Sequence, residues 1–323
     1  MKMNLSKMFF LSFMIVGVMI CLCSNNWLFI WCGLELSLIT FIPIMQSNLI
    51  ISSESMIKYF LIQSLSSGLL ILGLMMMMKL MFSFDLIMTL SIMLKMGVAP
   101  FHLWILSMIE GLKFLPMLLM MSISKITPLM ILSMIQLSMS MIISFTLIIG
   151  SVSGLNQTSL RKILTYSSIF NMGLILISIK TNFIWFYYLM VYSMLLTMII
   201  YLFSKMNMTY VNQMITIEHS LNNKMLLLMT LLSLGGMPPL LGFSIKLIVI
   251  EFTVMNTMIV NLIIIIMMSL LVMFFYMRMT YMSIMFFSMN QKWTIFKKNY
   301  ISSVLTTINL LTLPIFLASK MFN

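Results

Sequence analysis

Charge is what this sequence of 323 residues has least of. Charged side chains make up 7% of the chain, and only six of them are acidic, whereas hydrophobic residues make up 62% and the mean hydropathy is +1.14. Soluble domains carry about 25% charged residues, so the composition excludes a soluble globular protein. The sequence instead predicts an all-α, polytopic transmembrane helical bundle that forms a single integral membrane domain over residues 1–323.

Cysteine is also scarce, which limits the chemistry available to the chain. Cys21, Cys23 and Cys32 lie within apolar sequence, and their spacing suits neither a zinc site nor an iron–sulfur cluster. We expect them to be small core residues. No stretch resembles a nucleotide-binding loop, a pair of haem ligands or a catalytic triad. The sequence therefore predicts neither a cofactor nor a metal site in this chain.

Alanine is rarer still, with only Ala99 and Ala318 against 44 methionines. This bias is typical of an AT-rich gene read with a code in which ATA specifies methionine, as in animal mitochondria. The bias is evidence about the genome and says nothing about the fold.

Long apolar runs fill most of the chain, and a membrane span needs roughly 20 apolar residues. We expect eleven spans: Leu5–Cys23, Trp27–Met45, Ile57–Met78, Leu86–Ser107, Leu115–Leu132, Met134–Val152, Ile163–Ile179, Ile184–Phe203, Leu226–Phe252, Met258–Met279 and Ser303–Ala318. The polar connections at 207–223 and 288–302 are too short for a soluble domain. The start of the chain lacks the small-residue cleavage pattern of a signal peptide, so we expect the first span to be permanent.

The basic residues support this division into spans. Twelve of the 18 Lys and Arg residues fall on the side of the amino terminus, and three (Lys79, Lys180 and Lys320) fall on the opposite side. The positive-inside rule then places the amino terminus on the matrix or cytoplasmic face and the carboxyl terminus on the other face. We therefore attribute the net charge of +12 to loops on one membrane face and not to a nucleic-acid partner.

The remaining basic residues, Lys95, Lys125 and Lys246, lie inside spans, and Glu35 lies deep in the second span. A charge at the centre of a span costs about 2.5–3.5 kcal/mol on insertion scales. Burial in a medium of low dielectric constant favours a neutral amine, so a membrane lysine can bind and release a proton near physiological pH. These four residues could form a proton relay, or they could pair only to hold helices together.

Each of the three lysines has a helix breaker within eight residues. Glycine and proline follow Lys95 in KMGVAPFHLW (95–104), proline follows Lys125 in SKITPL (124–129), and two glycines and two prolines precede Lys246 in LLSLGGMPPLLGFSIK (231–246). Opened backbone in a bilayer occurs only where it is buried in protein or lines a wet cavity. The pattern therefore favours an ion path. His102 is either an ordinary interfacial histidine or an extension of this path.

These motifs, together with WCGLE (31–35) and GLNQTSLRKILTYSSIFNMG (154–173), closely resemble those of the antiporter-like membrane subunits of mitochondrial NADH:ubiquinone oxidoreductase, respiratory complex I. The resemblance implies an antiporter-like fold that lacks its first three helices, in the mitochondrial inner membrane. It implies that NADH, FMN, the iron–sulfur clusters and ubiquinone bind other subunits. The implied partners are other complex I subunits, especially neighbouring antiporter-like and small membrane subunits, and phospholipids such as cardiolipin.

The resemblance also assigns roles to single residues. Glu35 matches the membrane glutamate of the family, Lys95 and Lys246 match the lysines of two broken helices, and Lys125 matches a connecting lysine. On this basis Lys246 would be the terminal proton-exchanging residue. Leu106 stands where the family often has a second proline, so we expect a straighter end to the first broken helix.

Three hypotheses follow for the function. The leading one is a proton-translocating subunit without redox centres that uses energy from quinone reduction elsewhere in complex I. The second is a subunit of a multi-subunit cation/proton antiporter. The third is a scaffold whose membrane charges only lock helices together.

Overall fold

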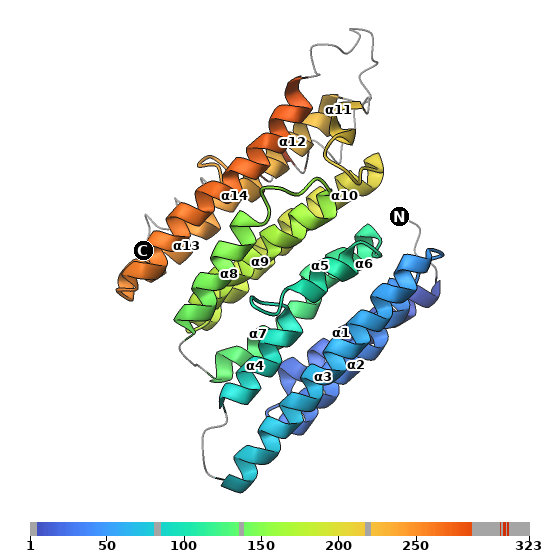
Figure 1. The fold of residues 1–323 in the computed structure, drawn as a ribbon, viewed down its shortest axis with the longest axis vertical. Coiled ribbons are helices and arrows are strands. Elements are labelled where there is room, and N and C mark those ends of the chain that lie inside the picture. Colours follow the sequence, from blue (N-terminus) through green and yellow to red (C-terminus); the bar gives the residue numbers. More distant parts are fainter. Residues whose placement is uncertain are drawn as a thin grey trace. The chain divides into compact units, whose positions relative to one another are not determined.

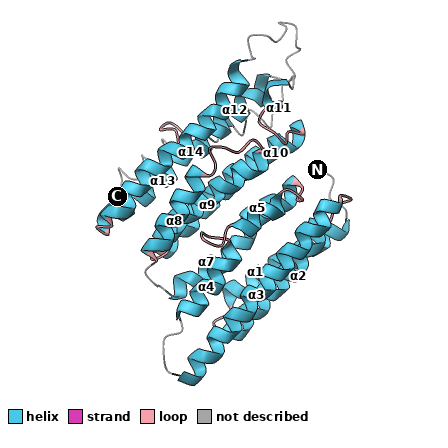
Figure 2. Cartoon of the chain, viewed as in Figure 1, coloured by secondary structure: helices cyan, strands magenta, loops and turns pink. Residues whose placement is uncertain are grey.

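A computed structural model describes residues 5–80, 85–135, 139–216 and 221–285, together with residues 304, 306, 307 and 309 (Figures 1 and 2). The described chain is helical, and its β-structure is limited to one isolated bridge between Ser159 and Tyr210. Seven described helices are long and apolar enough to cross a membrane. The prediction of an all-α polytopic membrane protein is confirmed. The eleventh expected span, Ser303–Ala318, lies almost wholly outside the described residues.

The helices fall into two compact units, Met1–Thr146 with Ile179–Thr181 and Leu147–Ser178 with Asn182–Asn323, which we call the first and second units. That both belong to the single membrane domain expected from the sequence stays a prediction. The first unit contains α1 (Leu5–Cys23), α2 (Trp27–Met45), α3 (Ile50–Leu80), α4 (Asp85–Met96), α5 (Leu103–Ile109), α6 (Phe114–Met121) and α7 (Ile123–Ile135). The second contains α9 (Leu160–Ser178), α10 (Asn182–Met206), α11 (Gln213–Thr216), α12 (Leu221–Gly235), α13 (Leu241–Met255) and α14 (Ile259–Met285), and α8 (Ser140–Val152) runs across the boundary in the chain.

Most expected spans correspond to observed helices. The bounds of α1 and α2 agree with the sequence prediction, whereas α3 begins seven residues earlier than expected, at Ile50. The polar first turns of α3 are held by local contacts, including the ion pair between Lys58 Nζ and Glu54 Oε1 at 2.6 Å. A pattern based on apolar residues misses such turns because they carry little hydrophobicity.

Three expected spans are divided in the structure. Leu86–Ser107 becomes α4 and α5, and Leu226–Phe252 becomes α12 and α13, which confirms both predicted broken helices. Leu115–Leu132 is also divided, because α6 ends at Met121 and α7 begins at Ile123. Helix α5 continues past Leu106 to Ile109, and the straighter end expected there stays a prediction.

Both broken helices stop by the same device. Gly97 and Gly236 have φ of 64° and 88°, a left-handed conformation that only glycine adopts at low cost. One residue later, Val98 N–H donates to Met93 O and Met237 N–H donates to Leu232 O, each over 3.2 Å. This Schellman arrangement satisfies carbonyls at the end of a helix that the following prolines prevent from continuing.

Small residues bring α1 and α2 together. A Cβ atom on Gly33 would lie 2.7 Å from Gly17 O and 2.6 Å from Cys21 Sγ, so a larger residue does not fit at this helix separation. Cys21 Sγ donates to Ile30 O over 3.2 Å, and its burial agrees with the core role expected for it, whereas Cys23 and Cys32 are exposed on this chain, so the expected core role is wrong for them. Close approach through glycine is typical of helix pairs in membranes. Gly33 lies two residues before Glu35, so this close helix contact also fixes the backbone position of Glu35 in the first unit.

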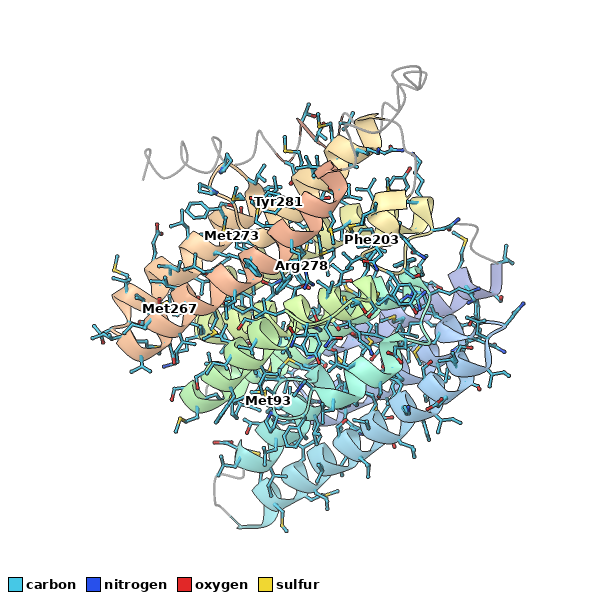
Figure 3. All side chains as sticks on the ribbon, turned by 45° about the horizontal axis from the view of Figure 1, so that its top comes forward. Met93, Phe203, Met267, Met273, Arg278 and Tyr281 are labelled. Carbon is cyan, nitrogen blue, oxygen red and sulfur yellow. The ribbon has the colours of Figure 1, made fainter. Side chains whose placement is uncertain are left out.

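In the second unit, Arg278 of α14 holds the connection that leads into α9. Figure 3 labels Arg278 on this helix. Its Nη1 donates to Leu155 O over 2.7 Å and its Nη2 to Gln157 O over 3.1 Å. Leu160 N–H also donates to Thr209 O, and Val211 N–H to Thr158 O, each over 3.0 Å. The polar segment 154–159 is therefore a loop that these hydrogen bonds hold at the entry to α9.

Replacing Gly97 by alanine tests the break between α4 and α5. The new Cβ would overlap Ile105 Cδ1 and lie 2.6 Å from its Cγ1, and a left-handed alanine costs about 1–3 kcal/mol. We expect a lower melting temperature of the detergent-solubilised protein and less folded protein in membranes. Gly68→Ala in α3 is the matched control, because a Cβ there meets nothing within 4 Å. Equal melting temperatures for the two variants would contradict this account.

Candidate functional site

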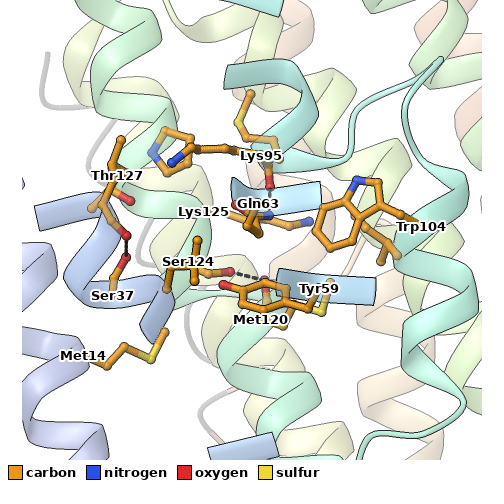
Figure 4. Close-up of a pocket in the computed structure, with 15 residues that line it drawn as sticks. Met14, Ser37, Tyr59, Gln63, Lys95, Trp104, Met120, Ser124, Lys125 and Thr127 are labelled. Atoms are coloured by element: carbon orange, nitrogen blue, oxygen red, sulfur yellow. Dashed lines mark hydrogen bonds between the residues drawn. The ribbon is translucent and has the colours of Figure 1, made fainter. Parts of the chain in front are cut away.

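Two of the three membrane lysines line one internal cavity in the first unit (Figure 4). Lys95 lies at the end of α4 and Lys125 in the first turn of α7, and they are only 9% and 5% exposed. All seven helices of the unit contribute to the lining, among them α1 with Met14, α2 with Ser37 and α3 with Gln63. Lys95 and Lys125 thus share one cavity, and their part in a proton relay stays a prediction.

The cavity has about 30 Å³ of space open to a water-sized sphere. A buried water needs roughly 10–15 Å³ by this measure, so the cavity has room for about two waters. Its walls combine lysine amines, the hydroxyls of Tyr59 and Ser124, and the amide of Gln63 with apolar side chains. A small polar chamber of this kind can hold water that solvates a proton near the two lysines.

Glu35 lies in α2 one residue after Leu34, which lines the cavity. Its carboxylate acts electrostatically on Lys95 and on Tyr59. Its Oε1 atom is buried and has no hydrogen-bond partner among the described residues. An acid held beside an amine without a fixed partner responds to any change of charge nearby, which is the property that a relay needs.

The break after Lys95 frees backbone acceptors, and a residue that the sequence analysis missed binds one of them. Gln63 Nε2 of α3 donates to Lys95 O over 3.1 Å. Gln63 is 32 positions away in sequence, so only the polarity of a glutamine in an apolar span could have indicated it. Tyr59 lies one turn before it, with its ring centroid 5.2 Å from that of Phe41 and 6.3 Å from that of Trp104.

A proline follows Lys125 within the same helix. Pro128 has no N–H to bind the carbonyl of Ser124, four residues earlier. Both Ser124 and Pro128 line the cavity, and Ser124 Oγ donates to Met120 O over 2.6 Å. The breaker predicted beside Lys125 thus lies at the cavity, although α7 itself continues.

His102 lies at the break between α4 and α5, half-buried, and is outside the cavity lining. Its Nδ1 atom is 3.2 Å from Pro100 O. Its part in a relay stays a prediction.

Lys246 lies in α13 of the second unit and is 6% exposed. Its Nζ donates to Gly235 O over 2.7 Å, across the break from α12. In a continuous helix the carbonyl of Gly235 would bond the N–H of residue 239, which is a proline and has none. Gly236 makes room for the amine, because a Cβ there would lie 2.7 Å from Nζ. The face of the Phe170 ring covers Nζ at 5.8 Å from its centroid.

No group of three or more His, Cys, Asp or Glu side chains in the described ranges is placed to hold a metal ion. The polar groups that the structure brings together are amines, hydroxyls, amides and backbone carbonyls. This set can carry and store protons.

The chain matches the family model described as NADH:quinone oxidoreductase/Mrp antiporter, transmembrane, over residues 24–85 and 78–273. It is 37% identical to NADH-ubiquinone oxidoreductase chain 2 of Anopheles gambiae, over 95% of this chain and 94% of that protein. It is 33% identical to the protein of the same name from Locusta migratoria, over 96% of this chain and 94% of that one.

Solved structures share the fold at low sequence identity. A chain of respiratory complex I from Thermus thermophilus superposes with a TM-score of 0.84 at 16% identity, over 97% of this chain and 78% of that chain. A chain of the Mrp complex from Dietzia sp. gives a TM-score of 0.75 at 14% identity, over 85% of this chain and 60% of that one. The antiporter-like fold expected from the sequence is confirmed, and both neighbours have longer chains.

Replacing Gln63 by leucine tests the contact across the first break. The variant leaves the buried Lys95 carbonyl without its donor, which costs about 1–3 kcal/mol. We expect a lower melting temperature of the solubilised protein. Ser64→Ala on the same helix is the control, because Ser64 Oγ bonds only Leu61 O of its own helix. A Gln63→Leu protein as stable as this control would show that the contact does not hold the break.

Proposed function

This chain belongs to the NADH-ubiquinone oxidoreductase chain 2 family, and we propose that it is a core membrane-arm subunit of a proton-translocating NADH:ubiquinone oxidoreductase. As such it is part of a translocase in which quinone reduction occurs on other subunits. The observation that carries the proposal is the pair of buried lysines that share one cavity with Glu35 beside it.

We propose that Glu35, Lys95, Lys125 and Lys246 carry the proton. A change in the charge of Glu35 alters the proton affinity of Lys95, because the two interact across a region of low dielectric constant. Lys95 and Lys125 line the same cavity, so two ammonium charges there repel each other and one lysine tends to release its proton. Lys246 is the terminal exchanging group in this scheme, and His102 extends the path at the first break.

The cell location and the partners follow from the family. We propose that the chain spans the mitochondrial inner membrane with its amino terminus on the matrix side, which the excess of basic residues on that side supports. Its partners are other complex I subunits, in particular neighbouring antiporter-like and small membrane subunits, and phospholipids such as cardiolipin.

The alternative of a cation/proton antiporter subunit is less favoured. The relatives above 30% identity that cover nearly the whole chain are named for the oxidoreductase, whereas the likeness to the Mrp complex is one of fold at 14% identity. Proton transport that needs NADH and quinone, together with co-purification of matrix-arm proteins, would exclude the antiporter.

Lys246→Met tests the terminal group of the relay. The methionine fills a similar volume but binds no proton, so we expect normal assembly and a proton-to-electron ratio lowered to half or less. The ratio is measured with the purified complex in proteoliposomes during NADH oxidation. Lys205→Met is the control, because Lys205 is exposed at the end of α10. Unchanged pumping in Lys246→Met would remove this residue from the relay.

Lys125→Met separates a relay from a scaffold. If Lys125 moves protons, the complex assembles and its quinone-reductase rate per assembled complex falls several-fold. If the lysine only locks helices together, the amount of complex falls while the rate per complex is kept. Blue-native gels and NADH:ubiquinone assays measure the two quantities, and Lys113→Met, at an exposed position, serves as the control.

A further inference from the structure

Three tyrosines that the relay does not use lie together inside the second unit. Tyr188 and Tyr192 come from α10 and Tyr276 comes from α14, and their side chains are 1%, 2% and 1% exposed. All three face the polar side of α9. We call Tyr188, Tyr192 and Tyr276 the tyrosine cluster.

The hydroxyls of the cluster meet a polar stripe on α9. Tyr188 OH donates to Asn171 Oδ1 over 2.8 Å. The side chains of Asn171 and Ser168 lie around the hydroxyl of Tyr192, and that of Ser167 lies near the hydroxyl of Tyr276. Three helices thus bring phenol, amide and serine groups into one buried place.

Two of these hydroxyls have incomplete hydrogen bonding. The OH groups of Tyr192 and Tyr276 are buried, and neither makes a hydrogen bond of normal geometry to a described residue, although Asn171 and Ser168 interact with the first and Ser167 with the second. Buried hydroxyls are nearly always bonded, either to protein or to ordered water. Water occupies buried sites when several polar groups converge on them, as they do here. Internal water that bridges each hydroxyl to these side chains would complete its hydrogen bonding.

The cluster lies against the groups that hold Lys246. A Cβ on Gly235 would be 3.5 Å from Tyr276 Cβ, so this tyrosine lies beside the residue of α12 whose carbonyl binds Lys246 Nζ. On α9, Asn171 directly follows Phe170, whose ring covers the same amine. Lys246 and the cluster thus share neighbours on two helices.

We propose that the tyrosine cluster encloses water and that its hydroxyls, with this water, conduct protons to and from Lys246. This inference rests on the proposed function. Each oxygen accepts a proton on a lone pair and passes its own proton to the next oxygen, so no phenol stays ionised. At the end of the chain the Lys246 amine gains the proton and becomes an ammonium. Asn171 accepts a bond from Tyr188 and orients it, but does not itself transfer a proton.

The first test removes hydroxyls and keeps the rings. Tyr192→Phe and Tyr276→Phe, alone and combined, are introduced into the intact complex, and the proton-to-electron ratio is measured in proteoliposomes. We expect normal assembly and a ratio at least twofold lower in the double variant. Tyr201→Phe is the control, because Tyr201 lies on α10 but is 38% exposed. Normal pumping by the double variant would overturn the proposal.

Lys246→Met, measured in parallel, distinguishes a failure of the tyrosine-cluster proposal from a failure of the proposed relay. If Lys246→Met lowers pumping and the double tyrosine variant does not, the relay stands and the cluster is only structural. If neither variant changes pumping, the relay through this unit fails as well.

The second test does not depend on activity. A map of the complex at a resolution that shows water should contain ordered water within hydrogen-bonding distance of both the Tyr192 and Tyr276 hydroxyls. A dry cluster in which these hydroxyls bond directly to protein would overturn the proposal.

Discussion

The constraint on which the structure depends is that a backbone carbonyl inside a membrane needs a donor. A continuous helix supplies these donors itself, but the helix is interrupted between α4 and α5 and between α12 and α13. At each break a left-handed glycine and a bond from the residue after it close the helix end, but one acceptor per break is left for a side chain. Gln63 binds Lys95 O in the first unit, and Lys246 binds Gly235 O in the second. A membrane protein normally pairs its backbone carbonyls within helices. At the two breaks, carbonyls instead bind side chains and hold them in fixed positions.

The environment of the lysines follows from the same constraint. Lys95 and Lys125 lie where the seven helices of the first unit converge, in a cavity just large enough for water. Such a small chamber keeps electrostatic interactions strong because little solvent screens them. Glu35 attracts Lys95 without forming a contact ion pair, so no fixed pair holds either group in one charge state. A tight pair would stabilise one charge state, whereas a relay has to pass through several.

Much of the fold and of the site could be predicted from the sequence, because membrane spans and membrane charges are both strong local signals. The bounds of α1 and α2, the two broken helices, and the burial of Lys95, Lys125 and Lys246 follow from runs of apolar residues and from glycine and proline. The sequence did not predict the division at Ser122, because no glycine or proline marks it. It did not predict the early start of α3, because the first turns of that helix are polar. Gln63 and the tyrosine cluster were not predicted for another reason, which is that their partners lie far away in sequence. The role of a single polar residue in an apolar helix is ambiguous until the packing shows which groups it faces.

The hydrogen bond between Lys246 and Gly235 has a consequence for the energy of proton exchange. A carboxylate partner would hold an ammonium strongly and a neutral amine weakly, so each loss of a proton would rearrange the site. A carbonyl is uncharged, and a neutral amine keeps two N–H groups. The bond of 2.7 Å can therefore persist in both protonation states. Lys246 can change charge with almost no movement of its own side chain, which gives the transfer a small reorganisation energy.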